Sequence, residues 1–119
     1  MLIERLNADF EFNDDRGSLI QLTRRGYSQI NYITSKGGVF RGGHYHKYNT
    51  EAFYMIKGKC RVTARKDGIT ETEEFVAGDF FRVGPYVLHD FDYIEDSALI
   101  SMYSLGIELD DGTKDSYTE

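Results

Sequence analysis

The chain alternates short apolar runs with turns that are rich in glycine and aspartate. Within many runs, apolar and polar residues alternate with a period of two, which is typical of strands that bury one face. No stretch maintains the apolar stripe of a helix for more than about two turns. The pattern therefore predicts strands at residues 9–13, 19–22, 28–34, 43–46, 51–57, 59–66, 69–76, 80–83, 88–94 and 99–105.

The turn signals between these runs set the fold class. Asp67-Gly68 separates two apolar runs and is a strong signal for a tight hairpin. Many short strands at such spacing predict an all-β sandwich or jelly-roll barrel. Residues 1–8 are expected to add an edge strand, and the polar, acidic residues 110–119 to form a flexible C-terminal tail. Open sheet edges that a second copy can cover favour a homodimer.

Composition narrows the class of protein. A chain of 119 residues is expected to form one domain, residues 1–119, with its core at about residues 9–109. The net charge of −6 argues against a nucleic-acid partner. The single cysteine, Cys60, lies in a predicted strand and fits a reducing compartment. No apolar run is long enough to cross a membrane, so we expect a cytoplasmic protein without a membrane partner.

All three histidines of the chain fall into one short pattern. The pattern G-x5-H-x-H-x4-E-x6-G covers residues 38–58 and contains His44, His46 and Glu51, while His89 follows a later turn. Two histidines at i and i+2 on a strand point to the same face. Three imidazoles and a carboxylate suit a first-row transition metal. The same imidazoles could instead serve as general bases.

This spacing resembles the first motif of the cupins. The second cupin motif usually reads G-x5-P-x-G-x2-H-x3-N, and Gly78 and His89 match it. Gly84, Tyr86 and Tyr93 stand where the motif has proline, glycine and asparagine, so the turn is expected to differ in shape. The resemblance implies a cupin-type double-stranded β-helix, which is a jelly-roll barrel. It says less about function, because cupins host many chemistries.

A narrower resemblance lies in two other elements. Residues 14–17 and 41–46 are similar to the D-x-R-G and R-G-x-H-x-[HQ] elements of cupins that act on nucleotide sugars. These are the dTDP-4-dehydrorhamnose 3,5-epimerases, the dTDP-4-keto-6-deoxyhexose 3,4-ketoisomerases and the cupin domains of capsular-polysaccharide epimerases. His46-Lys47 matches the ketoisomerases, and His44-Tyr45-His46 with Thr50-Glu51 matches the capsular type.

The resemblance implies proton abstraction next to the ketone of a nucleotide-linked 4-keto-6-deoxy sugar, in polysaccharide or deoxysugar biosynthesis. A ketone at C4 acidifies the C3–H bond, and an imidazole is suited to remove that proton. His44 is the first choice for this base, and His46 is its partner. Arg16 and Arg41 are the expected diphosphate contacts, and Lys47 adds positive potential.

The metal question stays open at the level of sequence. His44, His46, Glu51 and His89 would be the ligands of a divalent ion, either zinc, iron, manganese or nickel. The alternative is an isomerase without a metal, in which the histidines act only as acids and bases.

Two other functions stay open as well. The same four residues suit a metal-dependent cupin dioxygenase or oxidoreductase acting on another small molecule, and a non-catalytic cupin that binds a metal or a sugar. Tyr32, Tyr54 and Tyr103 are candidate proton donors or stacking groups. Tyr45 alternates with the histidines and is expected to pack on the opposite side of the sheet.

Overall fold

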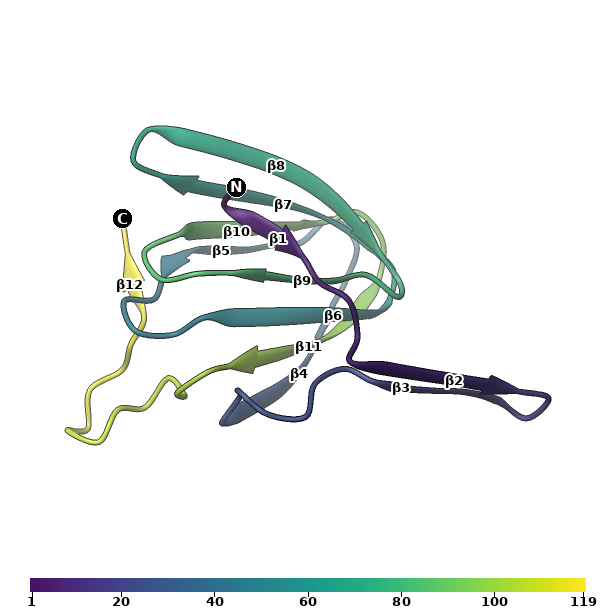
Figure 1. The fold of residues 1–119 in the computed structure, drawn as a ribbon. Coiled ribbons are helices and arrows are strands. Elements are labelled where there is room, and N and C mark those ends of the chain that lie inside the picture. The colour runs from purple at the N-terminus through teal and green to yellow at the C-terminus, as the bar shows by residue number, and fades with distance from the viewer.

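The computed structural model describes residues 1–119 and consists of strands without helices. Two antiparallel five-stranded sheets face each other, and a separate hairpin projects from them (Figure 1). Sheet I has the order β1 (Ile3–Arg5), β9 (Phe80–Val83), β6 (Glu51–Lys57), β11 (Ser97–Tyr103) and β4 (Gln29–Ser35). Sheet II has the order β12 (Tyr117–Thr118), β5 (Phe40–Tyr45), β10 (Leu88–Tyr93), β7 (Lys59–Lys66) and β8 (Ile69–Val76). The hairpin consists of β2 (Phe10–Asp14) and β3 (Gly17–Gln21). The predicted all-β, two-sheet architecture is confirmed.

The predicted strand boundaries hold best where the alternation is regular. Strands β6 to β9 have the predicted bounds. Asp67 and Gly68 both have positive φ angles, 52° and 78°, as the two-residue turn between β7 and β8 requires. Strand β5 begins at Phe40 instead of residue 43 and ends before His46, because two glycines inside it interrupt the apolar pattern.

The two chain ends are both part of the sheets. The expected N-terminal edge strand is present as β1, and Ile3 is wholly buried, so the core extends beyond its expected start at residue 9. The expectation of a flexible tail at residues 110–119 is wrong. Strand β12 pairs with the edge of β5, and Asp115 is completely buried. Backbone pairing and one buried carboxylate order this polar segment.

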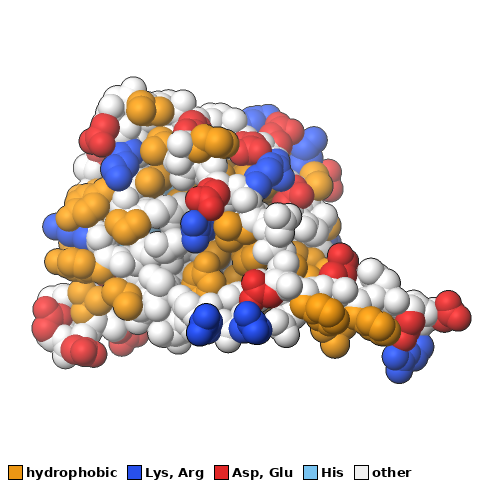
Figure 2. Space-filling model, in the orientation of Figure 1, with side chains coloured by type: hydrophobic (Ala, Val, Ile, Leu, Met, Phe, Trp, Pro, Cys, Tyr) orange, Lys and Arg blue, Asp and Glu red, His pale blue; other side chains and the backbone are white.

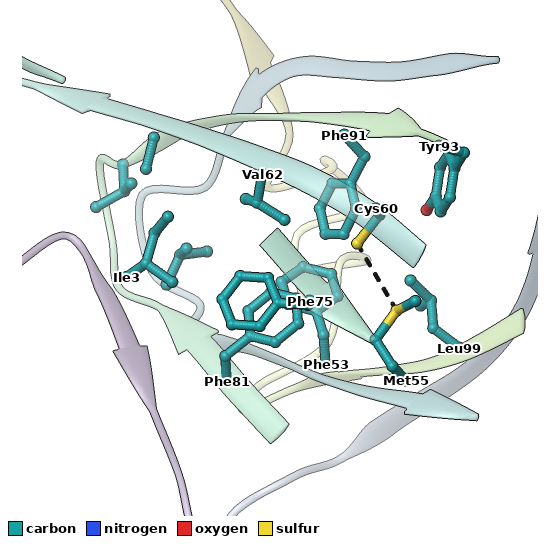
Figure 3. Close-up of a cluster of buried hydrophobic side chains, with 13 residues drawn as sticks. Ile3, Phe53, Met55, Cys60, Val62, Phe75, Phe81, Phe91, Tyr93 and Leu99 are labelled. Carbon is teal, nitrogen blue, oxygen red and sulfur yellow. Dashed lines mark hydrogen bonds between the residues drawn. The ribbon is translucent and has the colours of Figure 1, made fainter. Parts of the chain in front are cut away.

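The main hydrophobic cluster lies between the two sheets (Figure 3). Phe75 of β8 stacks on Phe81 of β9 with 3.7 Å between ring centroids, which joins sheet II to sheet I. Cys60 lies beside Met55 in this cluster, and burial raises the pKa of its thiol to about 12. Cys60 is therefore part of the hydrophobic core. The fold contains no helix with the length and apolar character that crossing a membrane requires.

A glycine lets β5 approach β10 closely, next to the histidines. Gly42 has a φ of 133°, and a Cβ atom there would lie 2.6 Å from Asp90 Cα and from His89 O. The register of the two strands shifts at this point, so that Gly43 is an extra residue in β5 and forms a β-bulge. A bulge re-aims the side chain that follows it, which here is His44.

We predict that Gly42→Ala lowers the free energy of unfolding more than Gly38→Ala. Both glycines have positive φ, which costs an L-residue about 1–2 kcal/mol. A Cβ at Gly38 meets nothing within 4 Å, whereas at Gly42 it must displace backbone, which adds about 1–3 kcal/mol. Urea denaturation of the two variants measures the difference. Equal losses in the free energy of unfolding would show that the close approach of β5 to β10 does not exclude a side chain at residue 42.

Candidate active site

The structure brings four of the predicted site residues together between the two sheets. His44 is in β5, His46 follows this strand directly, Glu51 begins β6, and His89 is the second residue of β10. One potential ligand atom from each lies within 4.8 Å of those of the other three. His46, Glu51 and His89 are almost completely buried. The polar cluster therefore lies in a dry part of the barrel.

Strand register explains how the three imidazoles meet. His44 lies directly opposite His89 in the β5–β10 pair, and opposite residues share a face of the sheet. The centroids of these two rings are 4.8 Å apart. The ring of His46 lies 5.3 Å from each of the other two. Three rings from two adjacent segments thus surround one small volume.

Backbone carbonyls determine which nitrogen carries the proton in two of these rings. Nδ1 of His46 is 2.7 Å from the carbonyl oxygen of Asp115, and Nδ1 of His89 is 2.9 Å from that of Val87. A carbonyl can only accept a hydrogen bond, so each Nδ1 must donate. In the neutral ring, Nε2 then carries a lone pair, and both Nε2 atoms face Glu51.

The carboxylate of Glu51 is held from both sides. Its Oε1 lies 3.0 Å from Nε2 of His46 and 3.2 Å from Nε2 of His89, and its Oε2 accepts a hydrogen bond from Ser101 Oγ at 2.5 Å. Burial alone would raise the pKa of Glu51, but the contacts with His46 and His89 lower it to about 2. The same carboxylate holds the pKa of His46 above its usual value, although burial opposes this.

This arrangement can hold a metal ion. Two imidazole lone pairs facing an ionised carboxylate repel it unless a proton or a cation lies between them. Nε2 of His89 is buried and has no well-aligned hydrogen-bond partner. Three imidazole nitrogens and one carboxylate oxygen form a donor set that suits zinc, and two of the rings, those of His46 and His89, have Nδ1 fixed on a carbonyl. The residues present therefore fit a divalent ion.

His44 lines an open cavity, as His89 also does, but it differs from the other two histidines because it is less buried and is not bonded to Glu51. The ring is partly buried and makes no contact with Glu51 at hydrogen-bond distance. Burial, followed by the charge of the neighbouring His89, lowers the pKa of His44. A neutral imidazole that faces a cavity can accept a proton. The cavity is lined by Ile33, Arg41, Gly42, His44, Glu51, Phe53, His89, Phe91, Tyr93, Leu99 and Tyr103.

Arg41 is the one predicted phosphate-binding residue at this cavity. Its Nε donates to Ser35 Oγ at 2.8 Å, and a terminal nitrogen donates to the carbonyl oxygen of Thr34 at 3.3 Å. These bonds connect β5 of sheet II to β4 of sheet I. The remaining N–H groups of the guanidinium stay available to an anion.

The other two predicted phosphate contacts lie elsewhere in this chain. Arg16 is at the tip of the projecting hairpin, where its Nε donates to Asp14 Oδ2 at 3.0 Å. Lys47 places its ammonium 4.3 Å above the ring of Tyr117. Neither residue lines the histidine cavity. Their role in phosphate binding stays a prediction.

The three candidate tyrosines differ in their position relative to the cavity. Tyr103 lines the cavity, its ring lies 5.2 Å from that of His46, and burial raises the pKa of its hydroxyl. Tyr32 is 65% exposed on the outer face of sheet I, and Tyr54 does not line the cavity. As expected, Tyr45 packs away from the histidines, stacked with other tyrosines.

Three polar residues around the cluster were not anticipated from the sequence. Ser101 faces inward in β11 in alternation with its neighbours, which is a signal that strand register could have given. Asn49 and Asp115 are buried and bonded to each other at 2.8 Å. These two residues are 66 positions apart in the sequence, so no local pattern indicates their contact.

Comparison with known proteins gives matches to proteins of sugar metabolism. The family model described as the polysaccharide biosynthesis C-terminal domain matches residues 12–116. A curated relative, the UDP-2-acetamido-2,6-beta-L-arabino-hexul-4-ose reductase of Pseudomonas aeruginosa, is 41% identical over 54 residues, which are 44% of this chain. The chain spans only 14% of the length of that relative.

Solved structures confirm the predicted jelly-roll fold. The 3,4-ketoisomerase of Helicobacter canadensis has a TM-score of 0.84 and 21% identity, with 100% of this chain and 92% of the other covered. The dTDP-4-dehydrorhamnose 3,5-epimerase of Sulfolobus tokodaii has a TM-score of 0.70 and 23% identity, with 87% and 75% covered. At these identities the likeness shows the fold.

Proposed function

The chain belongs to the polysaccharide biosynthesis C-terminal domain family, and we propose that it is an isomerase or epimerase for a nucleotide-linked 4-keto-6-deoxy sugar. The observation that carries this proposal is the position of His44. Its neutral imidazole lines the cavity, directly beside a buried cluster that can hold a cation. A base and an electrophilic site next to each other are what proton abstraction beside a ketone requires.

In the proposed reaction, His44 removes the proton from C3 of the bound sugar. The electrons of the C3–H bond form the C3–C4 double bond of an enediolate, and the ketone oxygen becomes an oxyanion. Return of the proton to the other face of C3 gives an epimer. Its return to C4, together with transfer of the proton of the C3 hydroxyl to the oxyanion on C4, leaves the ketone at C3 and gives a ketoisomer. Tyr103 lies at the cavity and, with its raised pKa, keeps a proton that it can donate by hydrogen bonding.

We infer that His46, Glu51 and His89 hold a divalent ion, with zinc the best match to two nitrogens and one oxygen. Three protein ligands with an open fourth position are typical of catalytic zinc sites, whereas four ligands are typical of structural ones. In such a site the ion would polarise the ketone and stabilise the oxyanion. His44 then stays free to act as the base.

The names of two solved structures, a 3,4-ketoisomerase and a 3,5-epimerase, support this function over the oxidoreductase alternative, whereas the curated relative is named a reductase. The 3,5-epimerase acts on a dTDP-linked 4-dehydro sugar, and the curated relative on a UDP-linked hexul-4-ose. Both substrates combine a nucleoside diphosphate with a ketone at C4. Arg41 is the cation at the cavity that would contact the diphosphate.

We also propose that the protein is a homodimer. The hairpin of β2 and β3 projects from the barrel and carries apolar side chains along its length (Figures 1 and 2). Phe12 and Leu19 are directly opposite each other, so they share one face, and both are about half exposed. A two-stranded hairpin alone is at best marginally stable in water. It therefore needs a surface on which to pack.

A second copy offers a suitable surface. Strand β4 forms the edge of sheet I, and Ile30 and Tyr32 on its outer side are each 65% exposed. An apolar hairpin face and an apolar sheet face on the same chain can satisfy each other in a two-fold dimer. Because the hairpin projects away from its own barrel, contact of Arg16 with substrate would require the cavity of the second copy.

We predict that His44→Ala abolishes deuterium incorporation at C3 when the protein is incubated with dTDP- or UDP-4-keto-6-deoxyhexoses in deuterated water. Loss of a general base lowers the rate by about 10²- to 10⁴-fold. Tyr45→Phe keeps the stacked ring outside the cavity and should exchange at the wild-type rate. Mass spectrometry and proton NMR measure the label. Normal exchange in His44→Ala would rule out His44 as the base.

We predict that removal of the ion by a chelator stops this exchange and that Zn²⁺ restores it. His89→Gln should weaken Zn²⁺ binding by at least tenfold, because a ligand is lost, whereas His44→Gln should keep one ion per chain. Equilibrium dialysis with metal analysis measures both variants. Full exchange after complete chelation would contradict a role for an ion, and loss of zinc from His44→Gln would make His44 a ligand.

We predict that Leu19→Glu converts the protein to a monomer, while Ser18→Glu leaves the dimer intact. The two positions are adjacent in β3, but only Leu19 is on the face that carries Phe12. Light scattering coupled to size-exclusion chromatography gives the mass of each variant. A monomeric wild-type protein at micromolar concentration would contradict the dimer.

A further inference from the structure

We propose that Asp115 is a positioning residue for His46. The C-terminal segment thereby fixes the orientation of the His46 ring at the reactive centre. The backbone carbonyl of Asp115 accepts the Nδ1–H of His46 at 2.7 Å. Only 2% of His46 is exposed, so water does not compete for this proton. With Nδ1 committed, Nε2 is the nitrogen that faces Glu51.

The side chain of Asp115 holds the chain that follows His46. Its Oδ1 accepts the backbone N–H of Lys47 at 2.7 Å, and its Oδ2 accepts those of Tyr48 and Asn49 at 3.0 Å. One buried residue therefore contacts the His46 ring through its carbonyl and the next three residues through its carboxylate. Together these contacts determine both the position and the rotation of the imidazole.

Asn49 connects this carboxylate to the rest of the barrel. Its side-chain amide donates to Asp115 Oδ2 and to the carbonyl of Gly106, both at 2.8 Å, and its Oδ1 accepts the N–H groups of Leu105 and Gly106. The backbone N–H of Asp115 donates to the carbonyl of Ile107 at 2.8 Å. These hydrogen bonds attach the segment after β11 to the turn between β5 and β6.

The contrast with His89 identifies His46 as the dependent ring. Nδ1 of His89 donates to Val87, only two residues away, so its own strand fixes it. The acceptor for His46 is 69 residues away and belongs to a segment that is otherwise mostly exposed. Strand β12 also pairs Thr118 with His44. His44 in β5 and His46 directly after this strand therefore share a support that His89 does not need.

The test compares the wild-type chain of 119 residues with Asp115→Ala, Asp115→Asn and Asp110→Ala. Asp110 is exposed in the same segment and its carboxylate makes no hydrogen bond, so Asp110→Ala is the matched control. Long-range proton–nitrogen NMR resolves the rings, because the chain has three histidines, and His46→Gln assigns the His46 signals. In wild type we expect a slowly exchanging Nδ1–H on His46.

In Asp115→Ala we expect that signal to exchange with water faster or to disappear, with the His89 signal unchanged. In Asp115→Asn, the amide oxygen can still accept the N–H groups of Tyr48 and Asn49, and mainly the acceptor for the N–H of Lys47 is lost. This variant should therefore fold and change the His46 signal less than Asp115→Ala does. Since outer partners of metal ligands affect ion affinity by about 10- to 100-fold, Zn²⁺ binding should weaken in the same order. Asp110→Ala should match wild type in both measurements.

A folded Asp115→Ala or Asp115→Asn with the wild-type His46 signal would overturn the proposal. A general loss of stability would affect the His89 and His46 signals together, and that outcome would also overturn it. The zinc measurement rests on the proposed function, whereas the NMR measurement does not. If the wild type binds no ion and exchanges no C3 proton, the proposed function fails, and the His46 signal still decides the role of Asp115.

Discussion

The buried carboxylate of Glu51 is the constraint on which the site depends. An ionised carboxylate in a dry interior costs several kcal/mol unless partners compensate it. Here the partners of Glu51 come from both sheets. Ser101 lies in sheet I, as Glu51 does, while His89 lies in sheet II and His46 follows one of its strands. The charge therefore holds the two sheets together at the point where the cavity opens. Removing one partner would leave a charge without compensation, so the polar cluster is a unit.

Several irregular features of the fold place the three imidazoles around that carboxylate. The bulge at Gly43 and the absent side chain at Gly42 bring β5 close enough to β10 to place His44 opposite His89. The C-terminal segment supplies a carbonyl to His46, which lies just beyond the end of β5. A regular sheet would satisfy backbone groups equally well. The irregularities are needed because three rings must converge within a few ångströms.

Sequence reasoning succeeded where the information is local. Strands β6 to β9 follow from alternation and from the Asp67-Gly68 turn, and the spacing of His44, His46, Glu51 and His89 placed them in one cluster. It failed where the decisive contact is distant. The acidic residues around Asp115 have no periodicity, and their burial depends on partners near Asn49. The strands of the hairpin were expected, but whether they pack on the barrel or project from it depends on packing that alternation does not reveal.

The geometry separates the roles of the three histidines in a way that spacing could not. His46 and His89 each have Nδ1 committed to a carbonyl and Nε2 turned to Glu51, so neither can accept a proton from a substrate without disturbing that carboxylate. His44 lines the cavity beside Arg41, and burial lowers its pKa. The proposed function needs a base that is neutral and that can reach the substrate, and we propose His44 for this role because its Nε2 and Nδ1 are not bonded to Glu51 or to Asp115. Under the proposed function, His46, His89 and Glu51 would then be the residues that hold an ion, while His44 stays free to move the proton.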